Sequence, residues 1–291
     1  MKTLVVILGP TGVGKTEKTL ALAEQLNVPV INADSRQIFK EIPIGSAAPT
    51  KEQQARVKHY FVGSHSIHDY YSAAQYEADV MALLEEQFRF ADYALMSGGS
   101  MMYIDAVCKG IDDIPTIDKS TRELYKQRLK DEGLESLLRE LKTVDPEHYA
   151  TVDRNNPRRV IHALEVCHMT GKTYTSFRKG TVKARPFNII KVGLNRTREE
   201  MYDRINSRVH TMIDKGLEEE ARGVYPYRDL NALNTVGFKE MFQYFDGAID
   251  IEEAIRRIQS NTRRYMRKQI TWFNHDDTIK WYHPDDEIII K

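Results

Sequence analysis

The chain has 291 residues, with 42 basic and 42 acidic side chains and 41% hydrophobic residues. This composition is typical of a soluble globular protein with one large α/β domain, or with a core domain and a smaller one. Its two cysteines, Cys108 and Cys167, are too few for a disulfide framework or a four-thiolate zinc site. No apolar run approaches the roughly 20 residues that cross a bilayer, and Leu4–Leu8 is too short for a signal peptide. We therefore expect a cytoplasmic protein with no membrane partner.

The N-terminal segment predicts a phosphate-binding loop between a strand and a helix. Thr3–Leu8 is an apolar β-type run, and a pattern of helical period begins near residue 15. The loop between them matches G-x-x-x-x-G-K-T and comprises Gly9, Pro10, Thr11, Gly12, Val13, Gly14, Lys15 and Thr16. Backbone amides at such a helix start bind an anion, the lysine adds positive charge, and the threonine hydroxyl ligates Mg²⁺. The segment predicts a diphosphate or polyphosphate site with Thr16 as the metal ligand; a glycine-rich turn without a ligand is the alternative.

A second strand, Pro29–Asn32, leads into the polar run Asp34, Ser35, Arg36 and Gln37. An aspartate at this edge of the sheet faces the phosphate loop, where it can act as a general base or assist a magnesium ion. The alternative is that Asp34 only caps the following helix. Both interpretations stay open on the sequence alone.

A third strand, Tyr93–Met96, continues into Ser97-Gly98-Gly99-Ser100 without an acidic residue. ATP-hydrolysing machines with a phosphate loop hold Mg²⁺ with an acid there, so its absence favours a transferase in which Asp34 is the main carboxylate. A fourth strand is expected at Asn188–Leu194. Strands that alternate with helices predict an α/β fold, a P-loop NTPase-like doubly wound parallel sheet, whose carboxyl strand ends meet in one crevice.

The middle of the chain differs, because residues 114–186 show helical periodicity without a convincing strand. We predict a P-loop core of residues 1–113 and 187–291, interrupted by a helical insertion domain of residues 114–186. Charge is also uneven on this formally neutral chain. Residues 154–210 hold thirteen Lys/Arg and four acids, and residues 255–270 hold six Lys/Arg and no acid. Such segments indicate a nucleic-acid-binding face or, equally well, ordinary solvated helices.

Seven ordered motifs from Thr3 to Phe273 resemble tRNA dimethylallyltransferases of the bacterial type, without a zinc finger: GPTGVGKT, NADSRQIF, SGGSMMYIDAV, NNPRRVIHALEV, RTREEMYDRINSRV, TVGFKE and TRRYMRKQITWF. The resemblance implies transfer of a dimethylallyl group from dimethylallyl diphosphate to the N6 amine of the adenine 3′ to the anticodon in tRNA. It also implies Mg²⁺, a monomer, and binding of the tRNA anticodon stem-loop. Members usually have threonine and glycine where this chain has Ser100 and Met101.

The resemblance also implies roles for particular residues. It assigns the catalytic role to Asp34, Thr16, Arg198 and Arg204, with both arginines on the diphosphate. A salt bridge to Glu200 or Asp203 on the same helix is the alternative for either arginine. The resemblance assigns tRNA binding to Asp34, Ser35, Arg36, Gln37, Ser100, Arg122, Arg158, Arg159, Val160, Ile161, His162, Asn234, Thr235, Val236, Gly237, Phe238 and Lys239.

Two other functions compete with the tRNA prenyltransferase. The first is a small-molecule kinase with ATP in the phosphate loop and Asp34 as its base. The second is a non-catalytic RNA-binding protein that is gated by a nucleotide. A metabolite kinase has no need of a basic insertion, and any turnover excludes the non-catalytic alternative.

Overall fold

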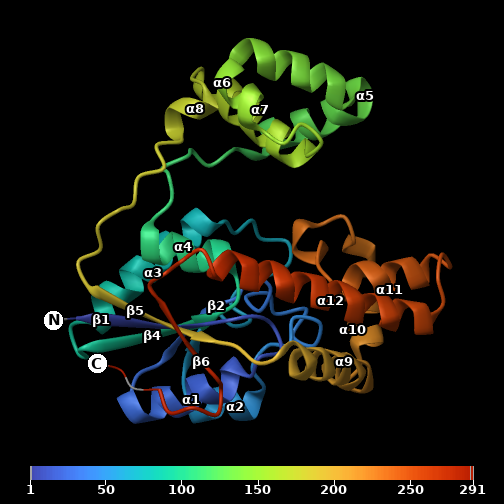
Figure 1. Cartoon of the computed structure of the whole chain (residues 1–291). Coiled ribbons are helices and arrows are strands. Elements are labelled where there is room, and N and C mark those ends of the chain that lie inside the picture. The colour runs from blue at the N-terminus through green and yellow to red at the C-terminus, as the bar shows by residue number, and fades with distance from the viewer. Residues whose placement is uncertain (1, 289, 291) are drawn as a thin grey trace. The chain divides into compact units, whose positions relative to one another are not determined.

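The computed structural model describes residues 2–288 and residue 290. Within them, six parallel strands form one sheet in the order β3-β2-β4-β1-β5-β6 (Figure 1). The strands are β1 (Thr3–Leu8), β2 (Val30–Ala33), β3 (His59–Tyr60), β4 (Tyr93–Gly98), β5 (Asn188–Leu194) and β6 (Ile279–Tyr282). The four predicted strands are confirmed within two residues. The two edge strands were missed because His59–Tyr60 is too short to show alternation and Ile279–Tyr282 carries polar residues.

Both faces of the sheet are covered by helices, because alternate residues of the central strands are apolar on both sides. Leu4, Val6 and Leu8 pack with residues of α3 (Ala73–Gln87) and α4 (Met101–Lys109). Val5 and Ile7 pack with residues of α1 (Lys15–Leu26) and α9 (Arg198–Asp214). The predicted doubly wound sheet is confirmed, and its carboxyl strand ends carry the phosphate loop and the run after Ala33.

A helical layer continues the core beyond the strand ends. It has its own apolar centre, which includes Ile38, Ile42, Leu217, Leu233 and Phe238. Its helices are α10 (Leu217–Val224), α11 (Phe238–Phe245) and the long α12 (Ile251–Phe273). The short helix α2 (Lys51–Arg56) lies earlier in the chain and begins with a capping box at Thr50. Helix α12 of this layer matters for function because, like α9, it reaches the phosphate loop.

The chain divides into two compact units, with boundaries at residues 109/110 and 183/184. The smaller unit contains α5 (Lys119–Val144), α6 (Pro146–Thr151), α7 (Pro157–Thr170) and α8 (Tyr174–Phe177). Its core is formed by Tyr125, Leu137, Leu141 and Leu164, with apolar neighbours from the same helices. Gly133, with φ 76°, interrupts α5. Among the described residues, no helix is long and apolar enough to cross a membrane.

Candidate active site

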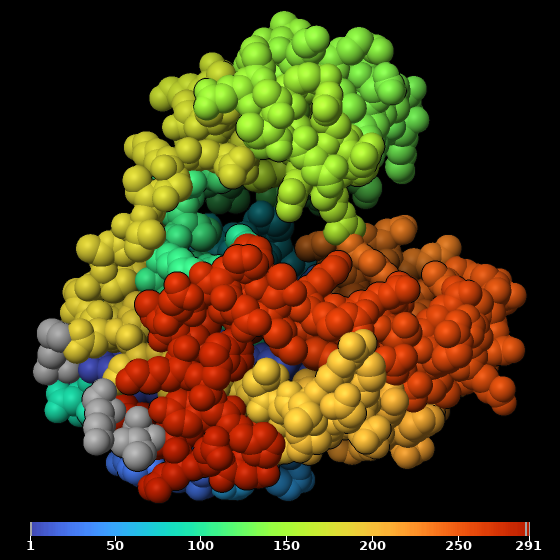
Figure 2. All heavy atoms as spheres, in the orientation of Figure 1, coloured from blue at the N-terminus to red at the C-terminus, as the bar shows by residue number. Residues whose placement is uncertain are grey.

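A cavity of about 1300 Å³ lies in the core unit. It is lined by residues of the phosphate loop, the ends of β2 and β4, helices α9 and α12, and the segment before α11. In Figure 2, blue atoms of the N-terminal part of the chain lie at the bottom of a hollow between α12 (red) and α9 (yellow). The predicted convergence of the phosphate loop, Asp34–Gln37 and Ser97–Ser100 on one crevice is confirmed.

The phosphate loop has the backbone that its glycines predict. Gly12 and Gly14 have φ values of 84° and 102°, in the left-handed region that favours glycine, and α1 begins at Lys15. The Lys15 ammonium donates hydrogen bonds to the carbonyl oxygens of Gly9 and Pro10, both at 2.9 Å. Burial lowers the pKa of Lys15 from about 10.5 to about 8, partly opposed by the charge of Asp34. A buried ammonium that is held only by neutral carbonyls is suited to an anionic ligand.

Helix α9 contributes two arginines to the same loop. Arg204 Nε donates to the Gly12 carbonyl at 2.8 Å, and Arg208 Nη1 donates to Thr11 Oγ1 at 3.4 Å. Burial lowers the pKa of Arg208. The negative charge of Asp34 opposes this shift, and the positive charge of Arg204 adds to it. Within the described residues, neither arginine forms an ion pair with a carboxylate. Sequence reasoning missed Arg208, although its position one helical turn after Arg204 was a usable signal.

Arg198 is predicted to lie on the diphosphate, but its side chain points elsewhere in this structure. Its Nε donates to the Tyr202 hydroxyl at 3.0 Å, its guanidinium lies 5.2 Å from the centre of the Tyr202 ring, and it does not line the cavity. The salt bridges that were its alternative are not formed either. A role for Arg198 on the diphosphate requires a different rotamer.

A second unpredicted residue, Gln269 of α12, joins the phosphate loop to the end of β4. It is 1% exposed, accepts a hydrogen bond from the Thr11 amide at 2.9 Å and donates to the Gly99 carbonyl at 2.8 Å. A Cβ atom on Gly99 would lie 2.5 Å from Gln269 Nε2, so a side chain at this position would displace the Gln269 amide. Because a buried amide in a basic, polar helix has no distinctive sequence pattern, only the fold reveals this contact.

Asp34 combines the two interpretations that the sequence left open. Its Oδ1 accepts hydrogen bonds from the amides of Arg36 at 2.9 Å and Gln37 at 3.4 Å, as a capping residue does. Its Oδ2 accepts none from the described residues, and Asp34 lines the cavity. One oxygen therefore fixes the carboxylate while the other remains available as a base.

Ser100 lies at the neighbouring strand end and is 6% exposed. Its hydroxyl oxygen accepts a hydrogen bond from the Ser35 amide at 2.8 Å and donates to Ser35 Oγ at 3.1 Å. Helix α4 begins at Met101, directly after this loop. The hydroxyl of Ser100 thus orders the run that carries Asp34.

Among the remaining tRNA-binding candidates of the core, Asn234, Thr235, Val236 and Lys239 line the cavity. Gly237 has φ 100° and precedes α11, and its amide donates to Glu240 at 2.8 Å. The side chain of Phe238 offers no surface for a contact in this structure, because it is 0% exposed and packs in the apolar centre of the helical layer.

In the smaller unit, Arg158 and Arg159 are exposed at the start of α7, where Asn156 caps the helix. Ile161 and His162 are partly exposed, and His162 lies 3.6 Å from Glu165. Arg122 is partly exposed and donates to the Ile117 carbonyl at 3.1 Å. The side chain of Val160 offers no surface for a contact in this structure, because it is 0% exposed and belongs to the core of this unit.

The basic segment of residues 154–210 is not one uniformly positive face. Arg185 forms a buried ion pair with Glu77 at 2.6 Å, and Lys191 pairs with Asp276 at 2.7 Å. These acids come from other parts of the chain, so a count along the sequence overstates the local charge. Arg158 and Arg159 form no ion pair with a described residue.

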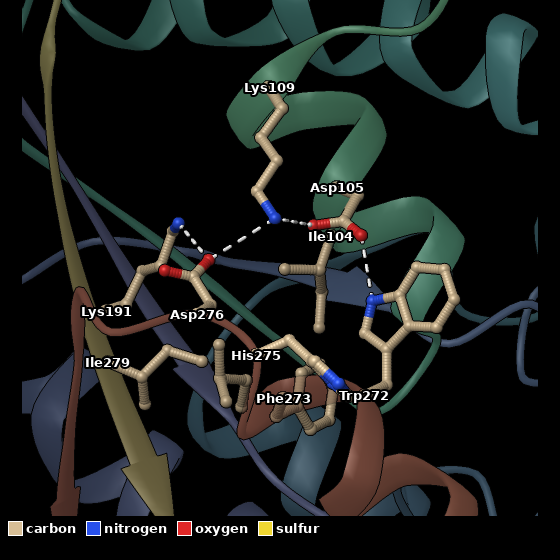
Figure 3. A pocket seen from close by; sticks show the side chains of 10 residues that line it. Ile104, Asp105, Lys109, Lys191, Trp272, Phe273, His275, Asp276 and Ile279 are labelled. Atoms are coloured by element: carbon tan, nitrogen blue, oxygen red, sulfur yellow. Dashed lines mark hydrogen bonds and ion pairs between the residues drawn. The ribbon is translucent and has the colours of Figure 1, made fainter. Parts of the chain in front are cut away.

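A second cavity of about 300 Å³ lies beside α4 and the end of α12 (Figure 3). Lys109 pairs with Asp105 at 2.9 Å and with Asp276 at 3.4 Å, and Lys191 pairs with the same Asp276 carboxylate. The Trp272 indole donates to Asp105 at 2.8 Å. Charged groups here neutralise one another, whereas Lys15, Arg204 and Arg208 pair with no carboxylate in the part of the chain that the structure describes. The large cavity is therefore the candidate active site.

Comparisons with known proteins agree with this geometry. The model of the family described as IPP transferase matches residues 37–276. The tRNA dimethylallyltransferase 1 of Phocaeicola vulgatus is 60% identical over 285 residues, which are 98% of this chain and 95% of that protein. Its counterpart in Bacteroides fragilis is 58% identical over 286 residues, with the same coverage.

Solved structures give the same result. The tRNA isopentenylpyrophosphate transferase of Bacillus halodurans has a TM-score of 0.70 at 34% identity, covering 98% of this chain and 90% of that one. A eukaryotic dimethylallyltransferase described as acting on tRNA has a TM-score of 0.79 at 24% identity, covering 98% and 75%, and shares the fold. The chain belongs to the tRNA dimethylallyltransferase family, also called IPP transferases.

Proposed function

We propose that this enzyme transfers a dimethylallyl group from dimethylallyl diphosphate to the N6 amine of the adenine 3′ to the anticodon in tRNA. In this reaction the bond from the allylic carbon to the diphosphate oxygen breaks, and a bond from that carbon to N6 forms. The amine loses one proton and diphosphate leaves. The observation that carries the proposal is that one cavity holds both the unpaired cations of the phosphate loop and a carboxylate with a free oxygen.

The diphosphate is the group for which the cations are suited. Negative charge develops on the leaving oxygens as the carbon–oxygen bond breaks, and fixed positive groups in a cavity stabilise that charge. Lys15, Arg204 and Arg208 converge on the loop, whose amides at the start of α1 add further donors. Arg208 replaces Arg198 as the first arginine expected to touch the diphosphate.

The donor set also fits Mg²⁺. This ion binds through few protein oxygens and several phosphate oxygens, so a threonine hydroxyl at the loop is sufficient beside a diphosphate. Thr16 lines the cavity, and the described residues contain no cluster of three or more acids, histidines or cysteines that would favour a metal held by protein alone. Bound there, Mg²⁺ would neutralise charge on the leaving diphosphate.

Asp34 is the proposed base. An amine that attacks carbon must lose a proton, and the Oδ2 atom of Asp34 is the carboxylate oxygen in the cavity that no described donor occupies. Because an adenine stacked in RNA cannot reach such a site, the base must leave the stack. The loop of Asn234–Lys239 lies at the same cavity and is suited to contact the extruded nucleotide.

The helical unit of residues 110–183 is proposed to hold the anticodon stem-loop, chiefly through Arg158 and Arg159. Their exposure and lack of acidic partners in the described structure support phosphate contacts. Catalysis needs no group from a second copy in this scheme, so we propose a monomer. A tRNA substrate is consistent with location in the cytoplasm.

The experiment is incubation of the enzyme with bulk tRNA, Mg²⁺ and dimethylallyl diphosphate, followed by mass analysis of the tRNA nucleosides. We expect N6-dimethylallyladenosine in amounts that depend on enzyme and on both substrates. A parallel reaction with γ-labelled ATP in place of the diphosphate tests the kinase. Transfer of labelled phosphate without a prenylated nucleoside would refute the proposed function.

A further inference from the structure

The carboxylate of Glu220, on α10, holds a loop that lies at the active-site cavity. Glu220 Oε2 accepts a hydrogen bond from the Ile44 amide at 2.8 Å, and Oε1 accepts one from the Gly45 amide at 2.7 Å. Hydrogen bonds to an ionised acceptor are stronger than neutral ones, so this pair fixes both amides together. Glu220 itself does not line the cavity, whereas Gly45 does.

The loop is packed as well as bonded. A Cβ atom on Gly45 would lie 2.4 Å from the buried ring of Phe238, so only glycine permits this approach of the loop to α11. Ala47 has a φ of 49°, in the left-handed region that costs a residue with a side chain some free energy. The contacts with Glu220 and Phe238 hold the backbone of residues 44–47 in this shape.

The same loop determines how the amide group of Gln37 is oriented. Gln37 Nε2 donates hydrogen bonds to the carbonyl oxygens of Ser46 at 3.2 Å and Ala47 at 3.0 Å. Since carbonyl oxygens only accept, the atom facing them must be the nitrogen and not the oxygen of the amide. Both of its N–H groups are used, and Oε1 accepts no hydrogen bond from a described residue. Gln37 lines the cavity, three residues after Asp34.

We propose that Glu220 is a positioning residue for base selection. By holding residues 44–47, it fixes the Gln37 amide so that Oε1 is offered to the cavity as a hydrogen-bond acceptor for the exocyclic amine of the target base. The inference rests on the proposed function, which supplies an adenine as acceptor substrate. It adds a specific orientation of Gln37 and a remote residue that maintains it.

The chemistry of adenine fits this arrangement. Its N6 amine carries two N–H groups, and the cavity offers two free acceptors on one short segment, Gln37 Oε1 and Asp34 Oδ2. One N–H is held by the glutamine while the other faces the base that removes it. A purine without the amine leaves both acceptors unpaired, and a base with a keto oxygen at that position places lone pairs against lone pairs.

The test compares binding of two anticodon stem-loop RNAs, one with adenine and one with unsubstituted purine at the target position. Wild-type enzyme should have a lower Kd for the adenine RNA, because Gln37 and Asp34 each accept one N–H of its amine. Glu220→Ala should reduce this preference by about 3- to 10-fold, the range of one neutral hydrogen bond, while the Kd for dimethylallyl diphosphate stays within a few fold. Glu219→Ala is the matched control, because Glu219 is exposed on the same helix and has the same charge. It should keep the full preference.

Two further variants keep the test decisive. Gln37→Met removes the acceptor directly and should lower the preference by the same factor as Glu220→Ala, leaving the share that Asp34 contributes, and adding Glu220→Ala to it should cause no further loss of preference. If Glu220→Ala does not fold, Glu220→Gln retains the size of the side chain but offers a donor to one amide, and should lower the preference partly. Equal weakening of both RNAs would mean that Glu220 only stabilises the fold, and that result would overturn the inference.

Failure of the proposed function can be distinguished from failure of the inference about base selection. If wild-type enzyme forms no prenylated nucleoside from the adenine RNA and dimethylallyl diphosphate, the proposed function is wrong whatever the binding preference. Two results with product formed would overturn only the inference about base selection. In the first, wild-type enzyme shows no preference for the adenine RNA; in the second, Gln37→Met and the Glu220 variants keep the full wild-type preference.

Discussion

Lys15 should make binding of the diphosphate depend on pH within an accessible range. With a pKa of about 8, roughly nine-tenths of the free enzyme carries a charged Lys15 at pH 7 and roughly one-tenth at pH 9. A bound diphosphate favours the charged form, so binding restores the proton. Affinity is therefore fully present below pH 8 and should fall by about tenfold for each pH unit above it.

Isothermal calorimetry with dimethylallyl diphosphate between pH 7 and 9.5, without Mg²⁺, measures both consequences. The charge of the ligand is constant there, because its last phosphate proton leaves near pH 6. Proton uptake on binding, obtained from buffers of different ionisation enthalpy, should rise from about 0.1 at pH 7 to about 0.9 at pH 9. Lys15→Arg is the control, since a guanidinium stays charged and should give a flat profile. A flat profile for wild type, or the same slope in Lys15→Arg, would refute the assignment.

The remaining predictions concern the base, the arginines and the RNA contacts. Asp34→Ala should lower the single-turnover rate by about 10²–10⁴-fold with tRNA affinity within a few fold, and a near-normal rate would exclude it as the base. Arg208→Ala should lower kcat/KM for dimethylallyl diphosphate by about 10²–10³-fold and exceed the effect of Arg198→Ala; the reverse order would return Arg198 to the diphosphate. The double variant Arg158→Ala, Arg159→Ala should reduce the slope of log affinity for tRNA against log salt by roughly 0.7–0.9 per lost contact, and an unchanged slope would place the RNA contacts elsewhere.

Local patterns in the sequence were sufficient where neighbours along the chain determine the structure. The phosphate loop depends on glycines that permit left-handed backbone and on an adjacent strand and helix, all of which lie between Thr3 and Leu26. The central strands were recognisable because burial on both faces gives continuous apolar runs. Convergence of the strand ends followed from parallel pairing alone, and the cavity at Asp34 confirms it.

Local sequence patterns could not predict which of the candidate tRNA-binding residues are buried. Phe238 and Val160 occur in motifs whose neighbours line the cavity or are exposed, yet both side chains lie in apolar cores. The direction of a side chain on a helix depends on which face packs, and that is decided by elements far away in sequence. For the same reason, part of the excess positive charge of residues 154–210 is balanced by ion pairs with acids from other parts of the chain, such as Glu77 and Asp276.

By itself, the sequence determined the class of fold, the anion-binding loop and the family, because these depend on short motifs and on periodicity. Only the tertiary structure decided which side chains serve that loop. Gln269 reaches Thr11 across 258 positions of the chain, and Glu220 reaches Gly45 across 175. Such contacts form when helices from the second half of the chain pack over the strand ends of the first half. The free energy that selects them comes from burial of apolar faces over the whole core, which no local pattern contains.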